Sequence, residues 1–275
     1  MRVLALSPGS LQQQLERLPA LAAVSDQLGA QIQVACEPAH RALWSLTPWI
    51  EKVIPFPFAG DPNLAEWANL LGLVREPDFQ ACLNFATGRQ VNLMLSMSHI
   101  PVRVATEGFS STALVSPVQG WQPQRLTSYL KPLGLSLKAD DFRLTLPAEA
   151  MEKARQQQPQ GQGPLLLLAP NGSANDWPDD RWQSLPDSIR QRLPQLRCEV
   201  LTPQTPVAQR AAAVACADVV LSSCATTQLL TVYCGVPLVA MGCAADALPE
   251  RDVVRVLPGT PQNLGTEEVM KALGF

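Results

Sequence analysis

Three short polar loops carry the residue types that could do chemistry in this chain. The first, Ser7-Pro8-Gly9-Ser10, follows an apolar run and precedes a segment of helical period. The segments 170–177, PNGSANDW, and 222–227, SSCATT, occupy the same kind of place further along. In open α/β sheets such turns bind ligands, because free N–H groups and the dipole of the following helix point outward there. Each loop is therefore a candidate site for an anion or a hydroxyl group.

The first loop has two interpretations. Gly9 and Ser10 are candidates for contact with a ligand. Alternatively, Gly9 only allows the tight turn and Ser10 only caps the helix, which requires no ligand. A single glycine is not the full dinucleotide fingerprint, so this loop alone does not indicate a nucleotide.

The second loop is richer in groups suited to phosphate oxygens. Asn171, Gly172 and Ser173 offer small polar groups and accessible backbone amides, and Arg181 adds a charge or a flat stacking plane. The alternative is a surface loop in which an aspartate caps the next helix and two tryptophans anchor the core. The residues concerned are Asp176, Asp179, Trp177 and Trp182.

The third loop opens an apolar helix at Thr226 and Thr227. Its hydroxyls and the free N–H groups of the first helical turn are suited to a diphosphate, although a plain helix cap explains the same residues. His40 and His99 are far apart and neither belongs to a cluster with metal-ligand spacing. We therefore expect no metal site, and no cofactor beyond the substrate.

The elements that must position these loops alternate along the whole chain. Short apolar runs follow longer segments of helical period, which predicts an α/β fold of doubly wound parallel sheets. The strands expected in the first half are Val3–Leu6, Gln31–Cys36, Lys52–Pro55, Ala81–Phe85 and Val102–Ala105, with helices at Leu11–Leu28, Ala39–Leu46, Leu64–Val74 and Val91–Ser98. In the second half we expect strands at Leu165–Ala169, Cys198–Leu201, Asp218–Leu221, Pro237–Met241 and Val253–Val256, with helices at Asp179–Leu193, Val207–Ala215, Thr226–Cys234 and Thr266–Leu273.

A chain of 275 residues is long enough for two such domains. Residues 156–163, QQQPQGQG, contain no apolar side chain and are the best candidate linker. We therefore predict an N-terminal domain over residues 1–155, a linker over 156–164 and a C-terminal domain over 165–275.

Bulk composition excludes several classes of protein. The net charge of −3 argues against a nucleic-acid backbone as partner, because such binding needs clustered Lys and Arg. The opening residues MRVLALSPGS hold too short an apolar run for a signal peptide or a membrane span, so we expect a cytoplasmic protein. The seven cysteines lack metal spacing and are expected to be reduced.

Read in order, these segments resemble the lipopolysaccharide heptosyltransferases that use ADP-heptose. The opening MRVLALSPGSLQQQLERLPAL is similar to that family's first strand, glycine loop and helix. The segments VACEPAHRALWSLTPWIEKVIPF and FATGRQVNLMLSMSHIPVRVA resemble its later N-terminal elements. In the second half, LLLLAPNGSANDWPDDRWQSL resembles the phosphate loop, and ACADVVLSSCATTQLLTVYCGVPLVAMG resembles the donor-binding turn.

The resemblance implies a GT-B fold, in which two Rossmann-like domains face a cleft. It implies a metal-independent, inverting transferase with a nucleoside-diphosphate sugar, ADP-linked in that family, as donor. The acceptor would be a glycan or a lipid-linked glycan at the inner membrane surface. Carried over to this sequence, Asn171, Gly172, Ser173, Thr226 and Thr227 would hold the diphosphate with help from Arg181, while Gly9, Ser10 and Gln13 would face the acceptor.

The chain departs from that family where the base is expected. The family's opening loop continues with Gly-Asp, whose Asp is regarded as the base, and here Gln12 and Gln13 stand in its place. An amide cannot accept the proton. The donor turn 224–229, CATTQL, also lacks the family's acid and histidine. Either Glu16, one turn further along the helix, replaces the base, or the chain is a catalytically silent nucleotide- or glycan-binding protein.

Overall fold

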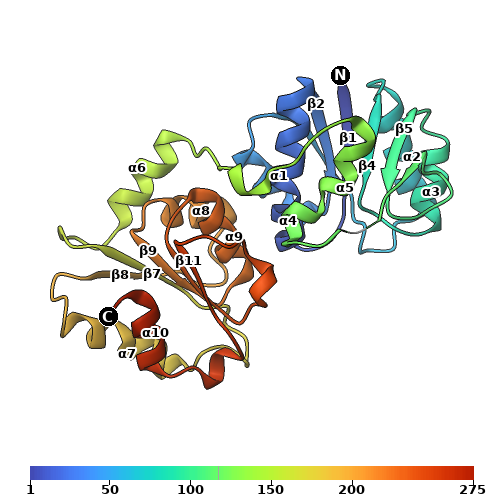
Figure 1. The fold of residues 1–275 in the computed structure, drawn as a ribbon. Coiled ribbons are helices and arrows are strands. Elements are labelled where there is room, and N and C mark those ends of the chain that lie inside the picture. Colours follow the sequence, from blue (N-terminus) through green and yellow to red (C-terminus); the bar gives the residue numbers. More distant parts are fainter. Residues whose placement is uncertain (117) are drawn as a thin grey trace. The chain divides into compact units, whose positions relative to one another are not determined.

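Two parallel sheets organise the chain, each within its own compact unit. In a computed structural model that describes residues 1–116 and 118–275, the units are Met1–Phe142 and Arg143–Phe275 (Figure 1). Every strand pairing is parallel. This is the α/β architecture predicted from the alternation of apolar runs and helical segments.

The first unit is a six-stranded sheet in the order β3-β2-β1-β4-β5-β6. Its strands are β1 (Arg2–Ser7), β2 (Gln31–Cys36), β3 (Ile50–Pro55), β4 (Ala81–Asn84), β5 (Val102–Ala105) and β6 (Ala113–Leu114). Its helices are α1 (Leu11–Leu28), α2 (Leu64–Arg75), α3 (Arg89–Ser96), α4 (Gln122–Arg125) and α5 (Thr127–Leu130), with 3-10 turns η1 (Pro38–Leu46), η2 (Lys131–Leu133) and η3 (Ala139–Asp141).

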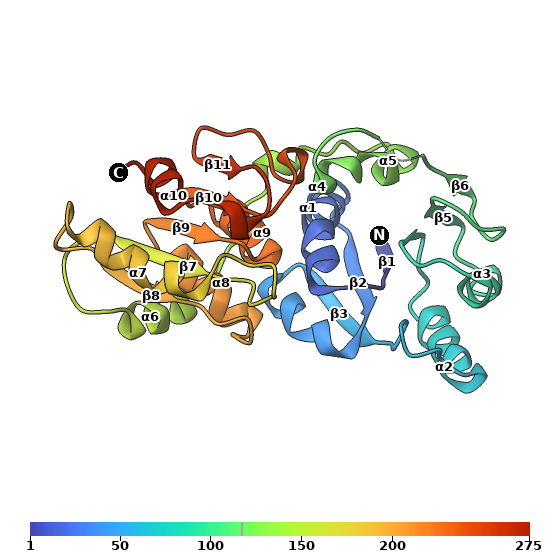
Figure 2. The ribbon, with the colours of Figure 1, turned by 90° about the horizontal axis from the view of Figure 1, so that it is seen from below.

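Helices α2 and α3 pack together against one face of this sheet. Leu4 and Leu6 of β1 and Cys82 of β4 meet Leu70 of α2 and Met94 of α3 in one apolar cluster. Helix α1 lies on the other face with α4 and α5 beside it (Figure 2). The central strands are buried on both sides, which explains their unbroken apolar sequence.

The second unit is a five-stranded sheet in the order β11-β10-β9-β7-β8. Its strands are β7 (Leu165–Ala169), β8 (Arg197–Val200), β9 (Val219–Ser222), β10 (Leu238–Met241) and β11 (Val254–Leu257). Its helices are α6 (Ala148–Gln157), α7 (Asp179–Arg190), α8 (Val207–Ala215), α9 (Ala225–Cys234) and α10 (Thr266–Leu273), with 3-10 turns η4 (Ala245–Ala247) and η5 (Pro261–Asn263).

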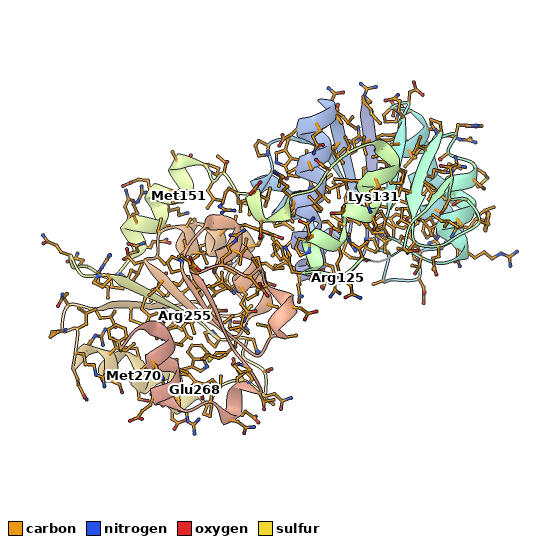
Figure 3. The ribbon with its side chains drawn as sticks, viewed as in Figure 1. Arg125, Lys131, Met151, Arg255, Glu268 and Met270 are labelled. Atoms are coloured by element: carbon orange, nitrogen blue, oxygen red, sulfur yellow. The ribbon has the colours of Figure 1, made fainter. Side chains whose placement is uncertain are left out.

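Two helices cover one face of this sheet and three cover the other. Helices α7 and α10 close the core that contains Trp177, Trp182 and Met270 (Figures 1 and 3). Helices α6, α8 and α9 lie on the opposite face, where the Met151 carbonyl of α6 accepts a hydrogen bond from the Cys216 thiol. The two tryptophans meet edge to face with ring centroids 5.2 Å apart, as the core-anchor interpretation of these residues expects.

Several features differ from the expected elements, and β6, α4, α5 and α6 were not predicted. The segment expected to be a helix at Ala39–Leu46 is the 3-10 turn η1, beginning at Pro38. The proposed linker begins inside α6, because Gln156 and Gln157 complete that helix. Helix α6 packs on α8, so residues 143–164 belong to the second unit and the division falls after Phe142.

Two further observations concern the described residues as a whole. All seven cysteines are free thiols. None of the helices in residues 1–116 and 118–275 is long and apolar enough to cross a membrane.

Candidate functional site

Each sheet has a point at which the strand order reverses direction, and ligands of open α/β folds bind in the crevice outside it. In the first unit this point lies between β1 and β4, where Leu6 pairs with Asn84. In the second it lies between β7 and β9, where Ala169 pairs with Ser222. All three polar loops of the sequence therefore lie at a switch point of their own unit.

The opening loop is stabilised by the start of α1. The Ser10 Oγ accepts a hydrogen bond from the N–H of Gln13, and the Gln13 Oε1 accepts one at 2.9 Å from the N–H of Ser10. This reciprocal capping box gives Ser10 the structural role that its sequence position allowed. Gly9 has φ +94°, and a Cβ there would overlap Gln13 Oε1, so the turn requires glycine.

Two buried polar side chains of α1 also hold this loop, and the sequence pattern did not single them out. Gln14 is fully buried; its Oε1 accepts from the Ser7 hydroxyl at 2.6 Å and its Nε2 donates to the carbonyls of Ser7 and Pro8. Arg17, 8% exposed, donates to the Ser7 hydroxyl at 2.7 Å and lies 4.7 Å from the centre of the Phe85 ring. In the sequence, these residues could have been noticed as two polar side chains, three positions apart, on a helix face that is otherwise apolar.

Gln13, Glu16 and Arg17 line one cavity of about 280 Å³ with Phe85 and Tyr129. We call it the Arg17 cavity; Thr106, Gln122, Arg125, Leu126 and Ser128 complete its wall, and Arg125 is marked on α4 in Figure 3. The two residues that the sequence put forward for catalysis, Gln13 and Glu16, are thus brought together.

Charges in the Arg17 cavity are shifted mainly by burial. Burial raises the pKa of Glu16 above its ordinary value, although the Gln12 amide that donates to its carboxylate at 2.9 Å and the nearby arginines partly oppose this. Burial lowers the pKa of Arg17 to about 10, which leaves it charged at neutral pH. A carboxyl group with a raised pKa beside a buried guanidinium suits proton transfer or an anionic ligand.

A second cavity of about 470 Å³ opens at the same switch point. We call it the Trp67 cavity; its lining residues are Pro8, Phe58, Asp61, Pro62, Trp67, Phe85, Ala86, Thr87 and Gln90. Phe85 belongs to the walls of both cavities, because it follows β4 at the carboxyl edge of the sheet.

In the second unit, the amides expected to bind phosphate already have a partner. The Asp176 carboxylate, 7% exposed, accepts hydrogen bonds from the N–H groups of Asn171 at 2.7 Å, Gly172 at 3.0 Å and Trp177 at 2.7 Å. The Ser173 N–H donates to the Asn171 side chain at 2.6 Å. Asp176 therefore organises the loop from within, and the loop amides point to its carboxylate.

Arg181 also has a structural partner. Its guanidinium donates to the carbonyl of Leu264 at 2.6 Å, which accepts a second hydrogen bond from the Trp177 indole at 2.9 Å. These contacts attach the start of α7 to the segment before α10. In this conformation the Arg181 charge is directed at backbone carbonyls.

The third loop contains a feature that the sequence interpretation missed. Arg210 of α8 is 3% exposed and donates to the Thr227 hydroxyl at 2.7 Å and to the carbonyls of Thr202 and Pro203 at 2.9 Å each. Thr227 is buried and Thr226 is partly exposed at the first turn of α9, which has no side-chain cap. An arginine among alanines in VAQRAAAVA was the signal available for it.

The second and third loops are joined at the switch point. The Ser223 hydroxyl accepts a hydrogen bond from the N–H of Asn171 at 2.9 Å. The first turn of α9, the Ser173 side chain and the buried Arg210 charge thus belong to one edge of the sheet. Free N–H groups at a helix start beside a positive charge favour an anion.

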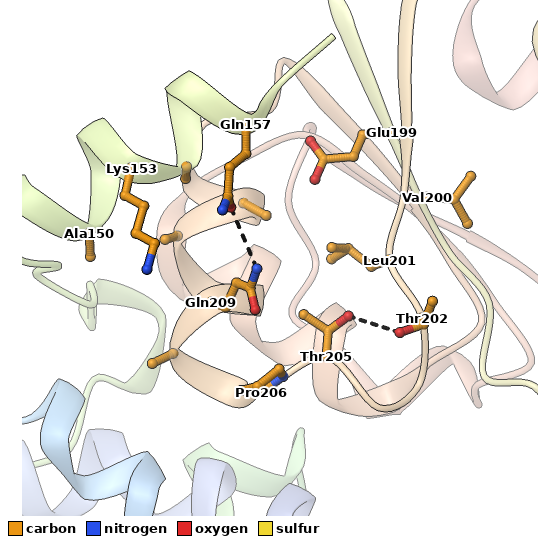
Figure 4. A pocket seen from close by; sticks show the side chains of 14 residues that line it. Ala150, Lys153, Gln157, Glu199, Val200, Leu201, Thr202, Thr205, Pro206 and Gln209 are labelled. Atoms are coloured by element: carbon orange, nitrogen blue, oxygen red, sulfur yellow. Dashed lines mark hydrogen bonds between the residues drawn. The ribbon is translucent and has the colours of Figure 1, made fainter.

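A further cavity of about 490 Å³ lies beside the edge strand β8, between α6 and α8 (Figure 4). Glu199 enters it from β8, and Lys153 and Gln157 enter it from α6. Gln209 of α8 donates to Gln157 at 3.5 Å. Burial raises the pKa of Glu199, and among the described residues no hydrogen bond reaches its carboxylate.

Within the described part of the chain, no three His, Cys, Asp or Glu side chains are grouped as a metal site would need. His40 lies in η1, and the His99 Nε2 accepts a hydrogen bond at 3.3 Å from the Arg75 guanidinium.

Comparison with known proteins shows which solved structures share this fold. A scan of protein-family profiles and a search of curated sequences each found no match. Among solved structures, the E. coli ADP-heptose LPS heptosyltransferase II superposes with a TM-score of 0.77 at 16% identity, over 100% of this chain and 98% of that one. This chain has the fold of these transferases.

Two more solved structures of transferases have the same fold. A glycosyltransferase of family 9 from Veillonella parvula superposes with a TM-score of 0.76 at 14% identity, over 98% of this chain and 90% of that one. The E. coli heptosyltransferase WaaC with ADP-2-deoxy-2-fluoro heptose gives 0.73 at 18% identity, over 100% and 99%. The likeness spans both units, as the resemblance of the ordered segments predicted.

Proposed function

We propose that this protein is a glycosyltransferase that moves a sugar from a nucleoside-diphosphate donor to a glycan or lipid-linked acceptor in the cytoplasm. The observation that carries the proposal is the fold likeness over both units to structures described as glycosyl- and heptosyltransferases. Two of the similar structures carry ADP or an ADP-sugar analogue, so ADP is the nucleotide to test first.

The donor diphosphate is proposed to bind at the first turn of α9. Thr226 is partly exposed there, and Arg210 holds the buried Thr227 from behind. Ser173 is exposed and its hydroxyl is available on the neighbouring loop. The amides of Asn171 and Gly172 are engaged by Asp176, so they contribute by shaping the loop.

For the acceptor side, we propose that Glu16 replaces the missing base. It shares the Arg17 cavity with Gln13, whose carboxamide oxygen is occupied by the Ser10 amide. Its raised pKa suits a general base, because a base works best when its pKa lies near the working pH. The acceptor hydroxyl would lose its proton to Glu16 as its oxygen attacks the sugar, and the diphosphate would leave with the bonding electrons, inverting the anomeric centre without a metal.

Calorimetry with ADP, GDP and UDP tests the donor site. We expect ADP to bind, and absence of binding by all three would remove the transferase. Donor hydrolysis should then be compared for the wild type, Glu16→Gln and Gln13→Asp. Losing a positioned base costs roughly 10²–10⁴-fold, so Glu16→Gln should lower turnover by that range while ADP binding is unchanged.

The second candidate is a catalytically silent binding protein, and the capping role of Gln13 favours it. It predicts ADP binding without turnover in the wild type. A large gain in turnover by Gln13→Asp would then show that only the base is missing.

A further inference from the structure

The Trp67 cavity combines aromatic walls with a few polar groups. Its rings are Phe58, Trp67 and Phe85, and its polar side chains are Asp61, Thr87 and Gln90. A volume of about 470 Å³ lies in the range of small-molecule sites, which are mostly apolar with few convergent polar groups. It lies at the switch point of the sheet, where such folds bind ligands.

The aromatic walls are fixed in place by a buried ring. Phe56, 4% exposed, has its ring centroid 4.7 Å from that of Trp67 and 4.8 Å from that of Phe58. Phe58 and Trp67 are only partly buried, and their centroids are 6.5 Å apart. Two rings are therefore held ready at the cavity surface, so little side-chain entropy is lost when a ligand packs on them.

The polar groups of the cavity lack protein partners. Among the described residues, none donates a hydrogen bond to the Asp61 carboxylate, and none bonds to the Gln90 carboxamide. Helix α3 begins beside them with Gly88 as an N-cap that supplies no side chain, so its first N–H groups are also available. The cavity thus presents an acceptor, a carboxamide and backbone donors beside flat apolar surfaces.

The Trp67 cavity and the Arg17 cavity differ in the charge of their lining residues. Of the described residues, none that lines the Trp67 cavity is a Lys or Arg and one, Asp61, is a carboxylate, so an anionic ligand would be repelled. Arg17 and Arg125 line the Arg17 cavity instead. The chemistry that fits the Trp67 cavity is uncharged, rich in hydroxyls and apolar on one face, which describes a sugar ring.

We propose that the Trp67 cavity binds an uncharged sugar ring of the acceptor, next to the ring that reacts in the Arg17 cavity. Phe85 separates the two cavities and lines both, so two linked rings would lie on either side of it. Trp67 covers the C–H face of the ring, and Asp61 accepts hydrogen bonds from its hydroxyls. The inference rests on the proposed transfer for the statement that this ring belongs to the acceptor, and it makes the acceptor at least a disaccharide.

Ligand-observed NMR by saturation transfer tests the binding directly. The probes are methyl glucoside and methyl galactoside as single rings, and maltose, cellobiose, lactose and chitobiose as double rings, at concentrations on the order of 10 mM. We expect a disaccharide to bind more tightly than either single ring, with the strongest transfer to the C–H protons of one ring. No signal from any of the six probes would overturn the proposal.

Variants assign the signal to the cavity. Trp67→Ala should weaken binding about tenfold, which corresponds to roughly 1.4 kcal/mol, because the apolar surface on which the sugar ring packs is removed. Asp61→Asn should weaken it about fivefold through a weaker hydrogen bond. Asp61 has φ +48°, a conformation that Asn also tolerates, so this variant keeps the loop. Glu199→Gln in the second unit is the matched control and should bind like the wild type.

The outcomes distinguish this inference from the proposed function. ADP binding and turnover by a chain whose saccharide signal is unchanged in both Trp67→Ala and Asp61→Asn would overturn the inference alone. Saccharide binding that depends on Trp67, in a chain that binds no nucleotide, would overturn the transferase and leave the sugar site.

Discussion

At the end of β1 the polar loop is held by two side chains of the next helix, Gln14 and Arg17, whereas at the end of β7 it is held by its own carboxylate, Asp176. In the first unit the stabilising groups come from α1, so the space outside the strand ends stays open as two cavities. In the second unit the Asp176 carboxylate itself accepts the hydrogen bonds of the loop amides. The same switch-point geometry thus yields an open sugar-sized site in one unit and a closed loop in the other.

This difference shows where an anion can bind in the second unit. A backbone amide that donates to a buried carboxylate is not available to phosphate, because both anions would compete for one donor. The first turn of α9 has no such competitor, since its N-cap Cys224 provides no side-chain bond. We therefore expect the diphosphate at α9 and not at residues 171–173.

Removing the Asp176 carboxylate is expected to have the largest effect on stability. Asp176→Ala leaves three N–H donors without their acceptor, and we expect a loss of about 3 kcal/mol in the free energy of unfolding of the second unit. Asp176→Asn keeps one acceptor oxygen and should lose about half as much. Chemical denaturation measures both, and equal stability of all three proteins would contradict the role given to this carboxylate.

Removing Arg210 tests the charge behind α9. Arg210→Met deletes the hydrogen bonds to Thr227, Thr202 and Pro203, and we expect about 2 kcal/mol lower stability, as for hydrogen bonds from a charged donor. ADP affinity should fall and become less dependent on salt. Thr227→Val is the control, because it removes one of these bonds and keeps the charge; ADP affinity that falls equally in both variants would assign the effect to local structure.

Substituting Gly9 tests whether the opening loop depends on its turn. Gly9→Ala places a Cβ at φ +94° and against the Gln13 carboxamide, so we expect a loss of about 1–2 kcal/mol in the first unit. In the double variant with Gln13→Ala the steric part should disappear while the backbone strain remains. Additive losses in the double variant would argue against the contact.

The course of the strands could be predicted from the sequence because both sheets are buried on two faces. The run Leu165–Ala169 reads as a continuous apolar strand and is one, and Leu11–Leu28 has the bounds predicted from its period. Helix α6 could not be found in this way, because only Ala154 of it is buried and its sequence carries no apolar stripe. Its last two residues, Gln156 and Gln157, fall in the predicted linker, and the rest of it lies in the predicted N-terminal domain without a predicted helix.

The candidate site was predictable in position and less so in chemistry. Strand order fixes the switch points, so loops at strand ends could be chosen from alternation alone. The sequence does not show which group accepts the hydrogen bond of a loop amide. The acceptor can be a residue distant in sequence, as Ser223 is for Asn171, or a side chain of the same loop, as Asp176 is. Phe85 follows the end of β4 and is distant in sequence from Asp61 and Trp67, so no sequence motif indicates that the three line one cavity.

The smallest expected effect concerns Glu16 and pH. Its pKa is raised in the folded protein, chiefly by burial, so the folded state holds the proton more firmly than the unfolded chain does. Stability from this group therefore falls as pH rises through the interval between its ordinary pKa and the raised value. Glu16→Gln should remove that fall and make the first unit slightly more stable at neutral pH, although it lowers turnover. Unfolding curves at acid and neutral pH measure the difference, and a variant less stable than the wild type at neutral pH would mean that the carboxylate is held by stronger contacts than those of Gln12 and the arginines.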